Sequence, residues 1–198
     1  MDILYRSAQA FAQLLDCEYD IVIGRKGRSV AFTIAFDKAH FHHLAGLHKL
    51  RDSGIFLRGK REHIFEAILD GEITLAQVEK SAYFKGIAQR MENLALLEKL
   101  LDDNHLVFRY QPEKAGYSKI QADFLLAHQL NAQEFYLFLV EEVGSNRQIC
   151  TSFFPKETMD YTKGQMKYTL LKKVKRNIRT GECITQVDRL SPKPCSSP

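Results

Sequence analysis

A cluster of histidines is the clearest candidate for chemistry in this sequence. Residues 40–48 hold four of the seven histidines in the chain: His40, His42, His43 and His48. Near neutral pH an imidazole can both accept and donate a proton, and it can contact a phosphate. His43 is therefore the candidate general base or acid, with boundary histidines on a helix surface as the structural alternative.

Further polar residues lie on segments that alternate like strands. Lys119, Gln121 and Asp123 share one face of a predicted strand, while Thr151 and Ser152 occupy opposite faces of another. Tyr161, Gln165 and Lys167 follow. Together with a histidine, such groups suit ribonuclease chemistry that needs no metal: one group takes the 2′-hydroxyl proton, another protonates the leaving oxygen and cations hold the phosphate charge. The alternative is an ordinary solvated sheet surface.

Several common catalytic motifs are absent. The chain contains no P-loop, no Gly-x-Gly-x-x-Gly, no His-Glu-x-x-His and no Gly-x-Ser-x-Gly. His40 and His43 have no third ligand near them in sequence, and the four cysteines are scattered without a Cys-x-x-Cys pair. We therefore expect neither a metal site nor a cofactor.

The net charge of +4 is mild but unevenly distributed. The segment 163–179 contains no acidic residue and seven basic ones: Lys163, Lys167, Lys172, Lys173, Lys175, Arg176 and Arg179. Such a basic stripe suits a polyanion, and a solvated strand or helix face explains it equally well. The candidate substrate-binding residues are Lys167, Lys172 and Lys173 of this stripe, together with Asp123, Thr151 and Tyr161.

The first half of the chain reads as a helix, a hairpin and then more helices. Apolar residues at helical spacing predict a helix over 3–15, and a strong hairpin follows over 19–36 around a basic turn. The histidine segment reads as helix, as does 59–103. Thr74 is a candidate N-cap there, with Gln77 as its capping-box partner.

The second half switches to a period of two. Strands are predicted at 105–110, 119–126, 135–140, 148–154 and 166–174, with 161–165 as a turn. The fold expected is α+β, with a twisted antiparallel sheet packed against helices. We expect one domain over 1–180 and a flexible Pro/Ser-rich tail over 181–198. With no signal-like start and no membrane-length apolar run, the expected location is the cytoplasm, with no membrane partner.

Four short motifs, spread between about residues 8 and 175, resemble one known family. These are Phe41 to Leu47 (FHHLAGL), Lys119 to Phe124 (KIQADF), Thr151 to Phe154 (TSFF), and Tyr161 with Gln165 downstream. Their order and rough spacing are similar to those of the fourth class of phage-associated nuclease-like domains of the Barnase–EndoU–colicin–RelE (BECR) superfamily.

The resemblance implies a helix-plus-antiparallel-sheet fold and an RNA-cleaving toxin or effector carried by phages and prophages. By the same resemblance the candidate catalytic residues are His43, Ser152 and Gln165, with Lys119 alongside them. RNA is the implied partner, with an antitoxin or host protein as a further one. Gly46 within the first motif also has a structural reading, because a glycine lets another element approach closely.

Three functional hypotheses follow from the sequence. The first is a metal-independent RNA endonuclease. The second is a non-catalytic module of the same fold that binds RNA or a host protein, and the third is a structural phage component with a degenerate nuclease fold. Convergence of His43, Lys119 and Ser152 in one cleft separates the first from the second, because binding alone does not require it.

Overall fold

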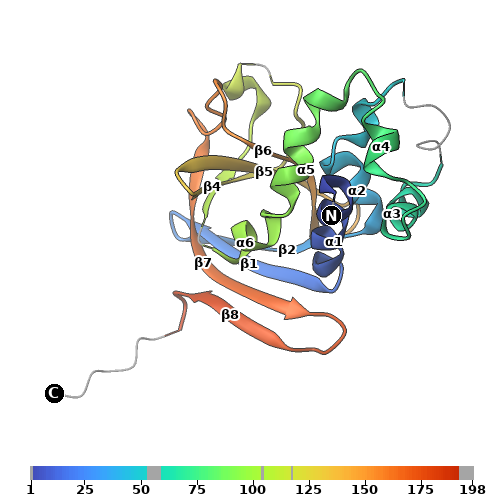
Figure 1. The fold of residues 1–198 in the computed structure, drawn as a ribbon. Coiled ribbons are helices and arrows are strands. Elements are labelled where there is room, and N and C mark those ends of the chain that lie inside the picture. The colour runs from blue at the N-terminus through green and yellow to red at the C-terminus, as the bar shows by residue number, and fades with distance from the viewer. Residues whose placement is uncertain (1, 53–58, 104, 117, 192–198) are drawn as a thin grey trace.

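The computed structural model describes residues 2–52, 59–103, 105–116 and 118–191 (Figure 1). Three short 3-10 turns are described: η1 (Leu47–Lys49), η2 (Phe84–Gly86) and η3 (Pro112–Ala115). The α-helices of the described ranges all precede residue 103. They are α1 (Ile3–Leu14), α2 (Lys38–Leu44), α3 (Arg61–Leu69), α4 (Leu75–Val78), α5 (Ala88–Leu94) and α6 (Leu97–Asp102).

Two strands form the early hairpin, and the remaining strands follow the helices. The strands are β1 (Cys17–Arg25), β2 (Arg28–Ala35), β3 (Leu106–Arg109), β4 (Phe124–Leu130), β5 (Gln133–Glu141), β6 (Arg147–Pro155), β7 (Met166–Asn177) and β8 (Cys183–Asp188). The predicted helix–hairpin–helices–meander order is therefore present.

The sheet closes on itself, which the sequence analysis did not predict. The strand order is β1-β2-β6-β5-β4-β3-β7-β8, and β1 also pairs with β7, so that seven strands form a closed barrel and β8 extends from β7. All pairings are antiparallel except that of β2 with β6, which is parallel. The prediction of an open antiparallel sheet packed on helices is therefore wrong: the structure has a mixed barrel.

The closing contact joins segments from the two ends of the chain. Tyr19 of β1 lies opposite Ile34 of β2 on one side and opposite Lys175 of β7 on the other. Bulges in the β1–β7 and β5–β6 pairings add local twist, which favours closure. Pairing between residues about 150 positions apart leaves no local signal in a sequence.

The inside of the barrel is continuous with the core of the helical layer. Phe32 of β2 and Phe124 of β4 stack with ring centroids 4.8 Å apart, although β6 and β5 lie between their strands in the sheet order. Such a contact is possible only across the barrel interior. Buried residues of the helices, including Phe11, Phe41 and Leu97, belong to the same core, and α5 and α6 lie in front of the barrel strands in Figure 1.

A second, smaller core lies on the opposite face of β3–β6. Alternate residues of these strands, among them Leu125, Tyr136 and Phe138, form this core, whereas Phe124, Leu126 and Leu137 belong to the first. Chain segments flanking β3 and β6 cover the second core, contributing Tyr110, Ile120 and Tyr161. This second core holds Ile120 and Tyr161, which lie outside the strands, in place against the barrel.

Three local predictions differ from the structure. The histidine helix ends at Leu44, and the predicted strand over 119–126 begins only at Phe124. Ile120 and Ala122 alternate because both pack on the second core, while the Ser118 hydroxyl accepts from the Ile120 backbone N–H at 3.1 Å and favours a local turn. Strand β8 lies inside the segment 181–198 that was expected to be a flexible tail. No helix in the described ranges is long and apolar enough to span a membrane.

Candidate functional site

Helix α2 places the histidine cluster against the barrel. Its N-cap is Asp37, whose carboxylate accepts from the Ala39 N–H at 2.9 Å, while Nδ1 of His40 accepts from the Asp37 N–H at 3.0 Å. His40 therefore has a capping role. The helix buries Phe41 and Leu44. Its remaining histidines, His42 and His43, lie half-buried in its last turn.

Gly46 ends the helical segment and brings it close to α5. Its φ of +80° lies in the left-handed region. A Cβ at this position would lie 2.9 Å from Cγ2 of Ile87 and 3.2 Å from Cδ of Arg90. The absence of a side chain at Gly46 thus lets η1 approach α5, which sets Arg90 beside the histidine cluster.

His43 and His48 stack across this turn. Their ring centroids are 4.1 Å apart and their planes differ by 10°. Burial lowers the pKa of His43 below its ordinary 6.5, and the nearby cations Arg61, Arg90 and Lys49 lower it further. Burial, followed by repulsion from His43, lowers the pKa of His48 to about 4. Both imidazoles are therefore neutral at pH 7, so that each has a nitrogen lone pair that can accept a proton.

Arg90 and Lys49 provide positive charge without a close carboxylate partner. Burial lowers the pKa of Arg90, and attraction to Glu157 opposes that shift. Burial and the charge of Arg90 lower the pKa of Lys49. Within the described ranges neither side chain forms an ion pair, and the guanidinium of Arg90 lies 5.7 Å from the ring centroid of Phe154. Such uncompensated cations suit a phosphate group.

These cations line a pocket of about 480 Å³ between α5, the end of β6 and the segment 157–161. Its apolar lining residues (the apolar wall) are Ile120, Phe154, Pro155, Met159 and Tyr161; its polar lining residues (the polar wall) are Lys49, Gln89, Arg90, Asn93, Glu157 and Thr158. Aromatic side chains together with hydrogen-bonding groups are typical of a ligand site. The volume lies within the range of small-ligand pockets.

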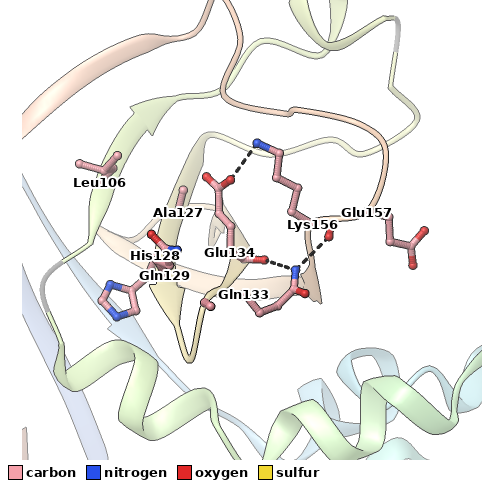
Figure 2. Close-up of a pocket in the computed structure, with 9 residues that line it drawn as sticks. Leu106, Ala127, His128, Gln129, Gln133, Glu134, Lys156 and Glu157 are labelled. Atoms are coloured by element: carbon pink, nitrogen blue, oxygen red, sulfur yellow. Dashed lines mark hydrogen bonds and ion pairs between the residues drawn. The ribbon is translucent and has the colours of Figure 1, made fainter.

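A larger pocket of about 610 Å³ lies at the β4–β5 turn (Figure 2). Its cation is already neutralised, because Nζ of Lys156 lies 2.8 Å from Glu134 and 3.0 Å from Asp160. The amide of Gln133 donates to the backbone carbonyls of Glu134 and Lys156 across its rim. This pocket contains none of the predicted site residues, whereas the smaller pocket contains Tyr161 and the cations Arg90 and Lys49, which act on His43. The smaller pocket is therefore the candidate site.

Two sheet residues of the prediction lie on β6, and neither of them lines the candidate pocket itself. Ser152 alternates with Phe154 and so shares the outer face of β6 with that pocket wall. Thr151 lies at the bulge, where its hydroxyl donates to the Phe138 carbonyl at 3.3 Å. Tyr161 lines the pocket itself, with its ring 5.6 Å from that of Phe154.

Three other predicted residues lie away from the pocket or have structural contacts. The side-chain amide of Gln165 accepts from the Gln111 N–H and donates to the Gln111 carbonyl, both at 2.9 Å. The carboxylate of Asp123 binds Arg109 at 3.1 Å and the Glu141 N–H at 2.9 Å. Lys119 is exposed in the segment before β4, next to the pocket residue Ile120. Neither His43, Lys119 nor Ser152 is among the residues that line the pocket.

Most of the basic stripe takes part in holding the fold together. Lys173 is completely buried, and its ammonium donates to the backbone carbonyls of Leu101, Asp102 and Asp103 at the end of α6. The other paired cations bind acidic residues: Lys175 binds Glu98 and Asp102, Arg176 binds Glu18, and Arg179 binds Asp16. A polyanion cannot reach Lys173, so its predicted substrate contact is ruled out. Lys167 is exposed and Lys172 half-buried.

Sequence reasoning missed Arg90, Lys49, Asn93 and Glu157. Arg90 and Asn93 lie within the apolar stripe predicted over 84–101, where polar residues read as the exposed side of a helix. Asn93 is in fact only 5% exposed, which no periodicity indicates. The described part of the chain contains no group of three or more His, Cys, Asp or Glu side chains positioned to hold a metal ion.

Comparisons with known proteins give one result. No curated protein matches the chain. No solved structure matches it either. A family profile, however, matches residues 3–190, which is nearly the whole length, and it describes a phage-associated nuclease. The chain belongs to the phage-Barnase-EndoU-ColicinE5/D-RelE like nuclease 4 family.

Proposed function

We propose that this protein is an RNA endonuclease whose catalytic centre lies in the pocket beside His43. The observation that carries the proposal is a neutral imidazole next to two cations, Arg90 and Lys49, that form no ion pair within the described ranges. Membership of a nuclease family supports the reaction class. The choice of RNA rests on the chemistry of this site, because a 2′-hydroxyl gives a neutral base a nucleophile to activate without a metal.

The reaction needs three events at one phosphate. The His43 imidazole takes the proton of the 2′-hydroxyl, and the 2′-oxygen then forms a bond to phosphorus. Arg90 stabilises the negative charge that develops on the phosphoryl oxygens. The bond from phosphorus to the 5′-oxygen breaks, and the Lys49 ammonium, whose pKa is lowered by burial and by Arg90, donates a proton to the leaving oxygen. The products are a 2′,3′-cyclic phosphate and a 5′-hydroxyl.

The apolar wall supports this assignment to a nucleic acid. Phe154 and Tyr161 stand beside Arg90, and aromatic rings next to a cation are a common way of holding unpaired bases. A strand whose phosphate contacts Arg90 and Lys49 would place a neighbouring base against this wall. Single-stranded or looped RNA fits such an arrangement better than a paired helix does.

The experiment compares wild type with His43→Ala, Arg90→Gln and Arg25→Gln on a labelled unstructured RNA. Arg25 lies on β1 and does not line the pocket, so its replacement controls for a general loss of positive charge. We expect His43→Ala and Arg90→Gln each to reduce the cleavage rate by about 100-fold or more, with Arg25→Gln close to wild type. Binding of RNA with a steep salt dependence but no cleavage by wild type would favour the non-catalytic module instead.

A further inference from the structure

One buried polar atom of the candidate pocket has no hydrogen-bond partner among the described residues. The side chain of Asn93 is 5% exposed and lines the pocket. Its Oδ1 accepts from Nε2 of Gln89 at 3.3 Å, whereas its Nδ2 is buried and has no hydrogen-bond partner among the described residues. A buried amide donor without an acceptor is costly, and most native donors of this kind have a partner.

The position of Asn93 indicates what that partner is. Asn93 follows Arg90 by three residues on α5, so both side chains lie on one side of the helix, and both line the pocket that Phe154 and Tyr161 also line. The Arg90 guanidinium lies over the Phe154 ring, 5.7 Å from its centroid, so a flat ring bound beside these aromatic residues would lie next to Arg90 and can present its edge to the Asn93 Nδ2. Arg90 and Lys49, the pocket cations proposed to contact the phosphate, are hydrogen-bond donors as well.

We propose that the pocket holds the nucleobase next to the scissile phosphate and selects bases that present a carbonyl, uracil and guanine, over those that present an amino group there. Asn93 supplies the selecting hydrogen bond through Nδ2. The inference rests on the proposed nuclease function for its substrate class. Uracil and cytosine differ at one ring position by carbonyl against amino, as do inosine and adenosine, so that an amino group would meet the Asn93 donor in place of an acceptor.

The direct test is the binding of nucleoside 3′-monophosphates, which contain no bond that this reaction would cleave. Calorimetry on the wild-type protein compares uridine with cytidine and inosine with adenosine 3′-monophosphate. We expect the carbonyl member of each pair to bind about 10-fold more tightly. In Asn93→Leu, which removes the donor and keeps similar bulk, the two members should bind equally. Gln9→Leu, which replaces an exposed amide of α1 outside the pocket, should retain the wild-type ratio.

A second variant covers the case in which Asn93→Leu does not fold. Asn93→Asp keeps the size and the acceptor for Gln89 but replaces the donor with an acceptor. We expect this variant to reverse the preference towards cytidine and adenosine. Equal binding within the wild-type pairs, tighter binding of the amino members, or no binding of any of the four would overturn the inference.

The two proposals fail in different ways. Cleavage of RNA by wild type without base selectivity would remove the base pocket and leave the nuclease. Carbonyl-selective binding together with intact RNA would retain the base pocket and remove the nuclease. Sequencing of the fragment ends from a random RNA pool provides an independent check, with ends enriched at uridine and guanosine in wild type and not in Asn93→Leu.

Discussion

His43 is the residue around which the proposed chemistry is arranged. Its half-buried ring stacks on His48, and three nearby cations, Arg61, Arg90 and Lys49, act on it. A base is active in its neutral form, so the cleavage rate should rise with pH through the pKa of His43 and level off above it. Because that pKa is lowered, the rate should reach half of its plateau value below pH 6.5.

The charge effect on His43 can be tested without altering the pocket. Arg61 begins α3 and lies outside the pocket lining, yet its charge is the largest after burial in lowering the pKa of His43. Arg61→Gln should raise that pKa, because less repulsion opposes protonation of the ring. NMR titration of the His43 ring protons at low salt measures the shift, with His43→Gln used for assignment. A wild-type pKa at or above 6.5, or no change in Arg61→Gln, would contradict this account.

At this scale the sequence identified residues by type and position but not by contact. His43 and Tyr161 stand out because of their chemistry and their place in short motifs. Tyr161 lines the candidate pocket, and the pocket cations Arg90 and Lys49 act on His43. Gln165 and Lys173 have the same kinds of side chain as functional residues, but their hydrogen bonds go to the backbone of distant segments. Only the tertiary fold distinguishes these two uses of a polar group.

Among the elements, the junction between η1 and α5 determines where the cations lie. Gly46→Ala adds a Cβ in the left-handed region and places it against Ile87 and Arg90. We expect the free energy of unfolding to fall by about 2 kcal/mol, the sum of backbone strain and a modest clash. Gly86 is the control, since a Cβ there meets nothing within 4 Å. Chemical denaturation should show Gly86→Ala close to wild type, and equal stability of both variants would refute the close-approach role of Gly46.

Element boundaries were predictable where the signal is local. Thr74 precedes α4 as expected, and the side chain of Gln77 accepts from its backbone N–H at 2.7 Å, so the capping box is confirmed. The strand predicted over 119–126 failed in its first half because packing on the second core imposes a period of two on irregular backbone as well. Residues Lys119 and Gln121 therefore never share a strand face.

For the whole molecule, the decisive feature is closure of the barrel, with the helical layer attached to it. The buried ammonium of Lys173 links β7 to the end of α6 by donating to the carbonyls of Leu101 and Asp102 at 2.7 and 3.0 Å. Tyr19 of β1 joins the same region through a 2.8 Å hydrogen bond to Asp102. The basic stripe therefore stabilises the contact between the barrel and the helices.

The buried lysine gives a prediction for global stability. Lys173→Met keeps an apolar chain of similar length but leaves the helix-end carbonyls without their donor, so the free energy of unfolding should fall by about 3 kcal/mol. Lys172→Met, at the neighbouring half-buried position, should change it by less than about 0.5 kcal/mol. Urea denaturation followed by circular dichroism measures both values. A Lys173→Met protein as stable as wild type would show that Lys173 is not a structural link.

The α+β content and the order of elements followed from periodicity, whereas closure did not. The strands β1 to β7 were visible as segments, whereas β8 lies in the predicted tail. The β1–β7 pairing and the parallel β2–β6 pairing join segments that are distant in sequence. The resemblance to the nuclease family rested on four short motifs, and the family match over 3–190 confirms it. The pocket lies where α5, the end of β6 and the segment 157–161 meet, so it could not be assembled from any one motif.

The chemistry of the product ends tests the central claim most directly. Wild-type protein is incubated in parallel with an RNA oligonucleotide and with its 2′-deoxy counterpart, and the fragments are weighed by mass spectrometry. Acid–base transfer through His43 predicts 2′,3′-cyclic phosphate and 5′-hydroxyl ends from the RNA and no cleavage of the deoxy strand. Cleavage of the deoxy strand, or fragments carrying 5′-phosphates, would contradict the account.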